Sequence, residues 1–137
     1  MPDFGITTTA TSGSDLTWLA SRHGTEAAQT ATLSVTSLTA GTHYDANGVI
    51  HSGLAVGKIT ASGLYGPFDA TATDGREKLA GFVLTDDVLQ RDLSGAFPAR
   101  TAFPLLVHGV IRPSRLPVAA QRTISSTTPT SGSFIYQ

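Results

Sequence analysis

The sequence predicts one mainly β domain with short helical turns and an extended N-terminal arm. The chain has 137 residues, a length typical of a single domain with a modest core. Between residues 31 and 118, short runs rich in Thr, Val, Leu and Ile alternate with Gly, Asn and Asp, the pattern of short strands joined by turns. Little of the sequence has the apolar period of a helix. These observations favour a compact fold of strands and tight turns.

Each expected strand follows from a local pattern. In the first of them, Leu33 and Val35 recur at period two, and the run at 103–111 is the strongest. Gly63 in the pair Ser62-Gly63 predicts a turn that joins two strands into a hairpin. The expected strands are residues 32–38, 54–60, 64–68, 79–85 and 103–111.

Helical turns and a terminal strand complete the expected elements. Asp86 and Asp87 suit the cap of a single turn at 86–91. A second short helical turn is expected at 119–124. After a Ser/Thr linker, the apolar residues 134–136 are expected to pair back onto a sheet as a last strand.

The composition divides the chain into an arm, residues 1–30, and a β-rich domain, residues 31–137. The arm is rich in Thr, Ser and Ala, and it has little that can form a core. Leu16, Trp18 and Leu19 belong to one or two expected turns of helix that stop before Gly24. A helix this short is unstable alone, so these side chains must dock either on the protein's own core or on a partner.

Charge and cysteine content exclude several classes of protein. Only 14% of residues are charged and the net charge is −1, which suits a protein that is packed against others and gives no basic surface for nucleic acid. Without cysteine there is neither a disulfide framework nor a thiolate metal site. The N-terminus does not have the pattern of a signal peptide, and we expect a soluble protein made in the cytoplasm, without a membrane partner.

The stretch GLAVGKITASGLYGPFD, residues 53–69, superficially resembles a phosphate-binding loop. Such a loop needs four residues between its first glycine and the Gly-Lys pair, followed at once by Ser or Thr. Three residues separate Gly53 from Gly57, and Ile59 follows Lys58. The segment also leads into another expected strand instead of a helix whose N-terminus could face phosphates. We therefore expect no nucleotide cofactor.

Catalytic and metal-binding patterns are equally weak. The four histidines are His23, His43, His51 and His108, and none stands three or four residues from another. His43 and His51 flank a turn and could approach each other, but no third ligand is evident. No Gly-x-Ser-x-Gly nucleophile elbow occurs. We expect no metal, no cofactor and no enzymatic activity, which leaves an interaction protein.

An ordered set of motifs resembles the lambda-type head decoration (capsid cement) proteins of tailed phages, in particular those of actinobacteriophages. The resemblance covers roughly residues 20–137, although each motif alone is only moderately specific. The motifs are residues 23–30, 52–60, 63–69, 74–75, 80–84, 107–111 and 115–117, followed by a helical stretch and a terminal apolar strand.

The resemblance implies a homotrimer on the exterior of the virion capsid, bound to the major capsid protein where three shell subunits meet. It implies a β-clip-like barrel and an N-terminal arm that becomes ordered on the shell. Many Thr residues suit an arm that adds a strand to another sheet. The candidate capsid-binding residues of the arm are Thr7, Thr8, Thr9, Leu16, Trp18 and Leu19. Tyr65, Pro67 and Phe68 are candidates for the trimer contact, with a role in the protein's own core as the alternative.

Two other functions fit parts of the same sequence. A trimeric β-rich tail or fibre protein would share the low charge and the Thr content. A small β-fold hydrolase or nucleotide-binding enzyme would need a deep pocket lined by His and carboxylates.

Overall fold

The computed structural model describes residues 15–137, and this part of the chain is mainly β, as predicted. Its helices are single 3₁₀ turns: η1 (Thr25–Ala27), η2 (Val35–Ser37), η3 (Pro113–Arg115) and η4 (Ala119–Gln121). Its strands are β1 (Gln29–Ser34), β2 (Val49–Ile50), β3 (Ala55–Lys58), β4 (Tyr65–Pro67), β5 (Leu79–Val83), β6 (Asp87–Val88), β7 (Arg100–Leu106), β8 (His108–Ile111) and β9 (Ser133–Tyr136). None of the described helices is long and apolar enough to span a membrane.

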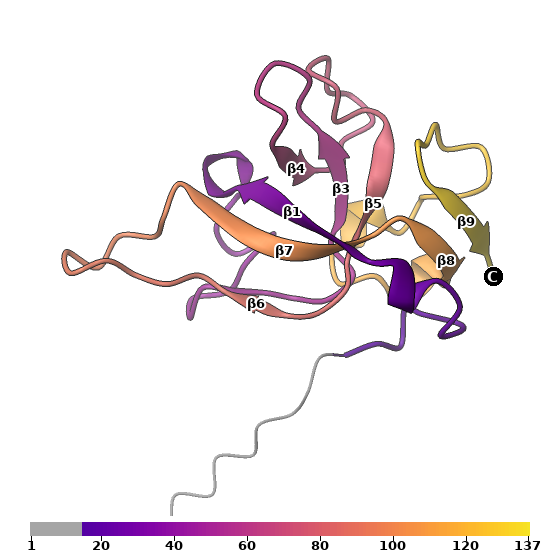
Figure 1. Cartoon of the computed structure of the whole chain (residues 1–137), viewed down its shortest axis with the longest axis horizontal. Helices are drawn as coiled ribbons and strands as arrows, with labels where there is room; N and C mark the ends of the chain where they lie inside the picture. Colours follow the sequence, from indigo (N-terminus) through magenta and orange to yellow (C-terminus); the bar gives the residue numbers. More distant parts are fainter. Residues whose placement is uncertain (1–14) are drawn as a thin grey trace, which may run out of the picture.

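Five strands form a closed ring in the order β1-β4-β3-β5-β7 (Figure 1). The longest pairing in the ring is antiparallel, between β1 and β7, from Gln29 opposite Leu105 to Ser34 opposite Arg100. A parallel contact of Leu33 with Tyr65 joins β1 to β4. Two smaller sheets lie outside the ring, antiparallel β2-β6 and parallel β8-β9.

The Gly-Lys stretch forms the expected hairpin. The chain turns at Gly63, whose φ of 73° is easily reached by glycine, and the Ile59 N–H donates to the Leu64 carbonyl at 2.7 Å. Gly57 lies on β3 close to the backbone of Arg76, because a Cβ atom at this position would be 2.6 Å from the Arg76 Cα. Glycine is needed here for close packing of backbones rather than for binding phosphate.

The core consists of two packed clusters. One includes Leu33, Val56, Phe103 and Leu105 of the ring strands, and all four side chains are buried. The other is built around Trp18 and includes buried residues of the ring, of β8 and of the segments after it. These are Ala55, Leu79, Phe82, Leu106, Ile111, Leu116 and Ile124.

Residues 15–30 differ from the expected arm because much of this segment belongs to the fold. Trp18 is 1% exposed, and Leu19 forms a bridge with Ile111 of β8. The Ala20 N–H donates to the Val110 carbonyl at 2.9 Å, and the Trp18 carbonyl accepts from the backbone N–H of residue 112 at 2.7 Å. The expected helix does not form here; residues 16–19 make a turn instead, closed by a 3.0 Å hydrogen bond from the Leu19 N–H to the Leu16 carbonyl. Of the two docking places expected for Trp18, the structure shows the protein's own core.

Two expectations about the second half of the chain were wrong. Residues 86–91 contain strand β6 instead of a helical turn, and the aspartates do not cap a helix. Asp86 instead accepts a 2.7 Å hydrogen bond from the Ser52 N–H, and Asp87 accepts one from the Thr101 hydroxyl at 2.9 Å. The run at 103–111 is not one strand, because the pairing partners change after Leu106 and β8 leaves the ring.

The C-terminal elements agree better with expectation. The η4 turn lies within the predicted helical stretch 119–124. The predicted terminal strand is confirmed as β9, which pairs in parallel with β8 from Ser133 opposite His108 to Tyr136 opposite Ile111.

Candidate interaction surface

The three residues predicted to make the trimer contact are largely covered by their own chain. Pro67 is buried, and Tyr65 and Phe68 are half-buried. The Tyr65 ring meets the Phe103 ring edge-on, with centroids 5.9 Å apart, and Phe68 packs against the Trp18 cluster. These contacts are those of the alternative, a role in the protein's own core, and the trimer contact stays a prediction.

The candidate capsid-binding residues of the arm differ in how accessible they are. Thr7, Thr8 and Thr9 lie outside the described residues. Trp18 is buried in the core and Leu19 is half-buried beside β8, so neither offers its full surface to a partner. Leu16 is 44% exposed and remains accessible.

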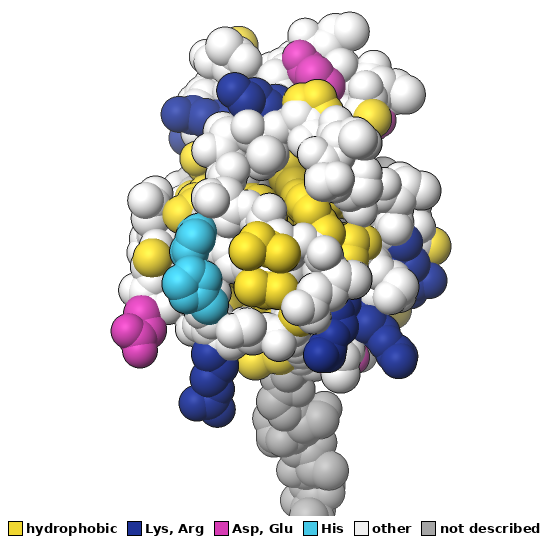
Figure 2. Space-filling view, turned by 90° about the vertical axis from the view of Figure 1, so that its right-hand side faces the viewer, with side chains coloured by type: hydrophobic (Ala, Val, Ile, Leu, Met, Phe, Trp, Pro, Cys, Tyr) yellow, Lys and Arg dark blue, Asp and Glu magenta, His cyan; other side chains and the backbone are white. Residues whose placement is uncertain are grey.

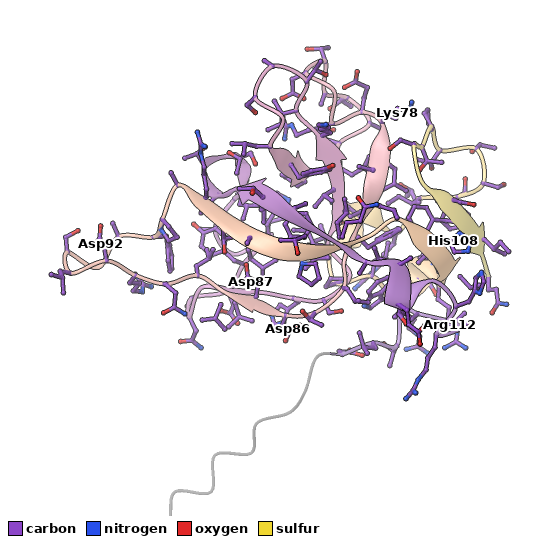
Figure 3. The ribbon with its side chains drawn as sticks, viewed as in Figure 1. Lys78, Asp86, Asp87, Asp92, His108 and Arg112 are labelled. Carbon is purple, nitrogen blue, oxygen red and sulfur yellow. The ribbon has the colours of Figure 1, made fainter. Side chains whose placement is uncertain are left out.

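One large apolar side chain of the described chain stands fully in solvent. The side chain of Leu93 is fully exposed to solvent. Leu16, Val88 and Ile135 are each between 44% and 64% exposed. Leu93 belongs to the segment 89–99 between β6 and β7, which we call the Leu93 loop. The loop extends away from the ring, and Asp92 lies at its far end (Figures 1 and 3).

The tip of the Leu93 loop is held by Asp92. Its Oδ1 accepts hydrogen bonds from the Ser94 N–H at 2.9 Å, the Ser94 hydroxyl at 2.6 Å and the Ala96 N–H at 3.0 Å. These bonds, the one from the Ser94 hydroxyl first, lower the pKa of the Asp92 carboxyl. Gly95 completes the turn with a φ of 84°. The turn that carries Leu93 is therefore ordered by its own side chains.

The base of the loop is held by Arg91 and Phe97. The Arg91 guanidinium lies 4.1 Å from the centroid of the Phe97 ring and donates to the Gly95 carbonyl at 2.8 Å. It also reaches the Ala46 carbonyl at 3.3 Å. The Phe97 ring in turn meets the Tyr44 ring edge-on at 5.3 Å. An exposed leucine on a loop fixed in this way loses little conformational entropy on binding, which favours a contact residue.

The sequence itself contains a signal for this loop. The order Asp92-Leu93-Ser94-Gly95 is typical of an Asx turn followed by a glycine with positive φ, and it places an apolar residue where turns are usually polar. Sequence patterns alone do not show that the turn stands away from the ring, since that depends on the β6 and β7 pairings.

Lys58 lines an open hollow of about 450 Å³ with Thr60, Gly75, Glu77 and Lys78. Lys78 lies near the start of β5 in Figure 3. The Glu77 carboxylate accepts a 2.8 Å hydrogen bond from the Gly75 N–H, so an acidic group shares the hollow with the two lysines. Because β3 continues into a turn and β4, Lys58 is not followed by a helix whose N-terminus could face the hollow.

His43 and His51, the pair that flanks a turn in the sequence, both line one small hollow but have different partners. His43 Nδ1 accepts a 2.8 Å hydrogen bond from the Thr39 N–H, and burial, with a contribution from Arg76, lowers the pKa of His43. His51 instead faces two carboxylates, those of Asp45 at 3.6 Å and Asp86 at 3.9 Å.

The histidines that do meet are His23 and His108, whose Nε2 atoms lie 2.6 Å apart. Sequence spacing gave no sign of this contact, because 85 positions separate the two residues. Within residues 15–137, no group of three or more His, Cys, Asp or Glu side chains is arranged to hold a metal ion.

No protein-family model matches the chain, and no significant similarity connects it to a curated protein or to a solved structure.

Proposed function

We propose that this chain is a phage capsid decoration protein, which binds as a homotrimer where three shell subunits meet and stabilises the head against internal DNA pressure. The proposal places it on the capsid exterior of the virion, with the major capsid protein as its partner. It assigns no catalytic activity to the chain.

The ordered set of motifs in the sequence carries the proposal. The motifs at 52–60 and 63–69 contain β3 and β4, and the motif at 80–84 covers most of β5; these strands are neighbours in the ring in the order β4-β3-β5. The motif at 74–75 packs on the same unit, because the Thr60 N–H donates to the Asp74 carbonyl at 2.9 Å. The motifs at 52–60, 63–69 and 80–84 thus lie on one continuous piece of the ring, with the turn at 74–75 packed against it. The five-strand ring is also compatible with the β-clip-like barrel that the resemblance implies.

We assign a shell contact to the Leu93 loop. A stable protein interface buries roughly 1,200–2,000 Å² in total, which a narrow projection with one apolar side chain does not supply. The loop therefore suits an added contact with the shell better than the main trimer interface. Three such loops on one trimer would act together, so each contact can be weak.

Two measurements test the proposal: the mass of the chain in solution and the position of the bound chain on the phage particle. We expect the purified chain to have the solution mass of a trimer and to bind empty, expanded heads of the phage that encodes it. Electron microscopy of the decorated heads should show added density at the capsid three-fold positions. Density on the tail would overturn the proposal in favour of a tail or fibre protein, and a monomer that does not bind heads would overturn it altogether.

Removal of residues 1–14 tests the arm. We expect the shortened chain to keep its fold and its trimer mass, because it retains Trp18, Leu19 and Ala20, which contact the core and β8. We expect its affinity for expanded heads to fall at least about tenfold, since an arm that pairs with a shell sheet contributes main-chain hydrogen bonds. Head binding equal to that of the full chain, measured by cosedimentation, would refute the role of the arm.

The variant Leu93→Asp tests the loop. We expect it to weaken head binding at least about tenfold, because a carboxylate cannot enter an apolar site without losing its hydration. Trimer mass and thermal stability should not change, because Leu93 contacts solvent and not the core. The matched control is Leu93→Met, which keeps an apolar side chain and should retain binding. Unchanged cosedimentation of Leu93→Asp with heads would remove the loop from the shell contact.

A further inference from the structure

His23 and His108 bring two imidazole nitrogens to one point at the surface. Their Nε2 atoms are 2.6 Å apart, with ring centroids at 4.5 Å and ring planes at 67°. His23 is exposed and His108 is half-buried. His108 projects from β8 in Figure 3, and histidine side chains lie together on the face of the molecule shown in Figure 2.

The backbones that carry the two rings are fixed against each other. Gly24 has a φ of 87° and lies so close to the His108 carbonyl that no Cβ atom would fit between them. On the other side, a Cβ atom at Gly109 would lie 3.3 Å from the His23 carbonyl oxygen. The hydrogen bond from the Ala20 N–H to the Val110 carbonyl anchors the segment before His23 to β8. The fold therefore places the two residues side by side, and only small side-chain rotations decide how far apart the rings lie.

Two neutral imidazoles that face each other through Nε2 share one proton, donated by one ring and accepted by the other. If the donor ring instead adopts the other neutral tautomer, with its proton on Nδ1, both Nε2 atoms present lone pairs to the same point. Neutral imidazole nitrogen is a preferred ligand of zinc, nickel and copper ions. We propose that His23 and His108 form a two-imidazole site for a divalent transition metal ion of this class.

The geometry is close to what such an ion requires. At Zn–N distances of 2.0–2.1 Å and a tetrahedral angle, two ligand nitrogens are about 3.3 Å apart, so the rings must separate by roughly 0.7 Å. The exposed ring of His23 can rotate by this amount without disturbing the core. Since the described residues supply no third ligand here, water completes the coordination. The site is thus exchangeable and differs from a closed structural zinc site, which has four protein ligands.

Metal bound in this way would connect the segment before η1 to β8. His23 and His108 are 85 positions apart, so the ion would close a long loop of the chain. A ligand that binds the folded state and not the unfolded state raises the stability of the fold. The inference does not rest on the proposed function, because it concerns only the free chain.

The test uses the full chain without an affinity tag, titrated with Zn²⁺ and with Ni²⁺ by calorimetry. We expect saturable binding of one ion per chain and a rise of the thermal midpoint, with no response to Mg²⁺ or Ca²⁺, which prefer oxygen ligands. His23→Ala and His108→Ala should each weaken binding at least about tenfold. The matched control is His51→Ala, which removes the histidine between Asp45 and Asp86 and should bind as the unchanged chain does.

Two results would overturn the inference. One is the absence of saturable Zn²⁺ or Ni²⁺ binding by the unchanged chain, and the other is undiminished binding by His23→Ala. Because His23 is exposed, that variant should fold even if His108→Ala does not. Imidazole resonances provide a second readout, since Zn²⁺ should shift the ring signals of His23 and His108 together and leave those of His43 in place.

Discussion

Replacing Trp18 with alanine is expected to lower the free energy of unfolding by about 3–5 kcal/mol, the usual cost of removing a large aromatic side chain from a core. Trp18 is 1% exposed and packs on Phe82 with ring centroids 5.5 Å apart. The Trp18 ring also packs directly against Gly53. A Cβ atom added to Gly53 would lie only 2.9 Å from this ring. The variant loses the 2.9 Å hydrogen bond from the indole Nε1–H to the Ser52 hydroxyl. Ser52 keeps its own 2.6 Å bond to the Leu84 carbonyl.

Urea unfolding of the full chain measures this effect, at one fixed protein concentration because subunit association would add to the apparent stability. The matched control is Leu16→Ala, two positions away in the same segment but 44% exposed, for which we expect a loss of less than about 1 kcal/mol. If Trp18→Ala were as stable as the control, residue 18 would not belong to the core in solution. In that case its assignment to a partner-binding arm would regain support.

Replacing Gln121 with leucine is expected to cost about 2–4 kcal/mol, although the two side chains are similar in size. Gln121 is 3% exposed. Its side-chain amide pairs with the backbone of β3 in the way that a neighbouring strand would. Its Oε1 accepts from the Ala55 N–H at 2.9 Å, while its Nε2 donates to the Ala55 carbonyl at 2.9 Å and to the Phe68 carbonyl at 3.3 Å. Leucine leaves the buried Ala55 N–H without its acceptor, and such a group costs roughly 1–3 kcal/mol.

The same substitution at an exposed position, Gln90→Leu, is the control. It should change the free energy of unfolding by less than about 0.5 kcal/mol. Hydrogen exchange gives a local readout, because the Ala55 amide should exchange faster in Gln121→Leu even at the same fraction folded. Equal stability and equal protection of the Ala55 amide would show that another acceptor replaces the glutamine.

Local chemistry explains what could be predicted of the fold. The β3–β4 hairpin follows from strand residues on both sides of a glycine turn, and the η4 turn and β9 also lie where short-range patterns indicate them. The turn in the Leu93 loop was readable in the same way from Asp92 and Gly95. These features depend on contacts between residues a few positions apart, which a sequence shows directly.

The errors concern contacts over long distances in the chain. Asp86 suits a helix cap locally, but the Ser52 N–H, 34 positions away, uses its carboxylate instead. The strand at 103–111 divides because Leu106 pairs within the ring while His108 pairs with β9. A pattern of apolar residues is equally compatible with one long strand or two short ones, since both bury the same side chains.

Local sequence patterns are enough to predict a mainly β chain of low charge, together with its turns and the motifs on which the proposed function rests. Tertiary structure alone decided that Trp18 is part of the core, that Leu93 stands away from the ring, and that His23 meets His108. The reason is physical: turn and strand preferences arise from neighbouring residues, whereas burial and convergence arise only when distant segments pack together.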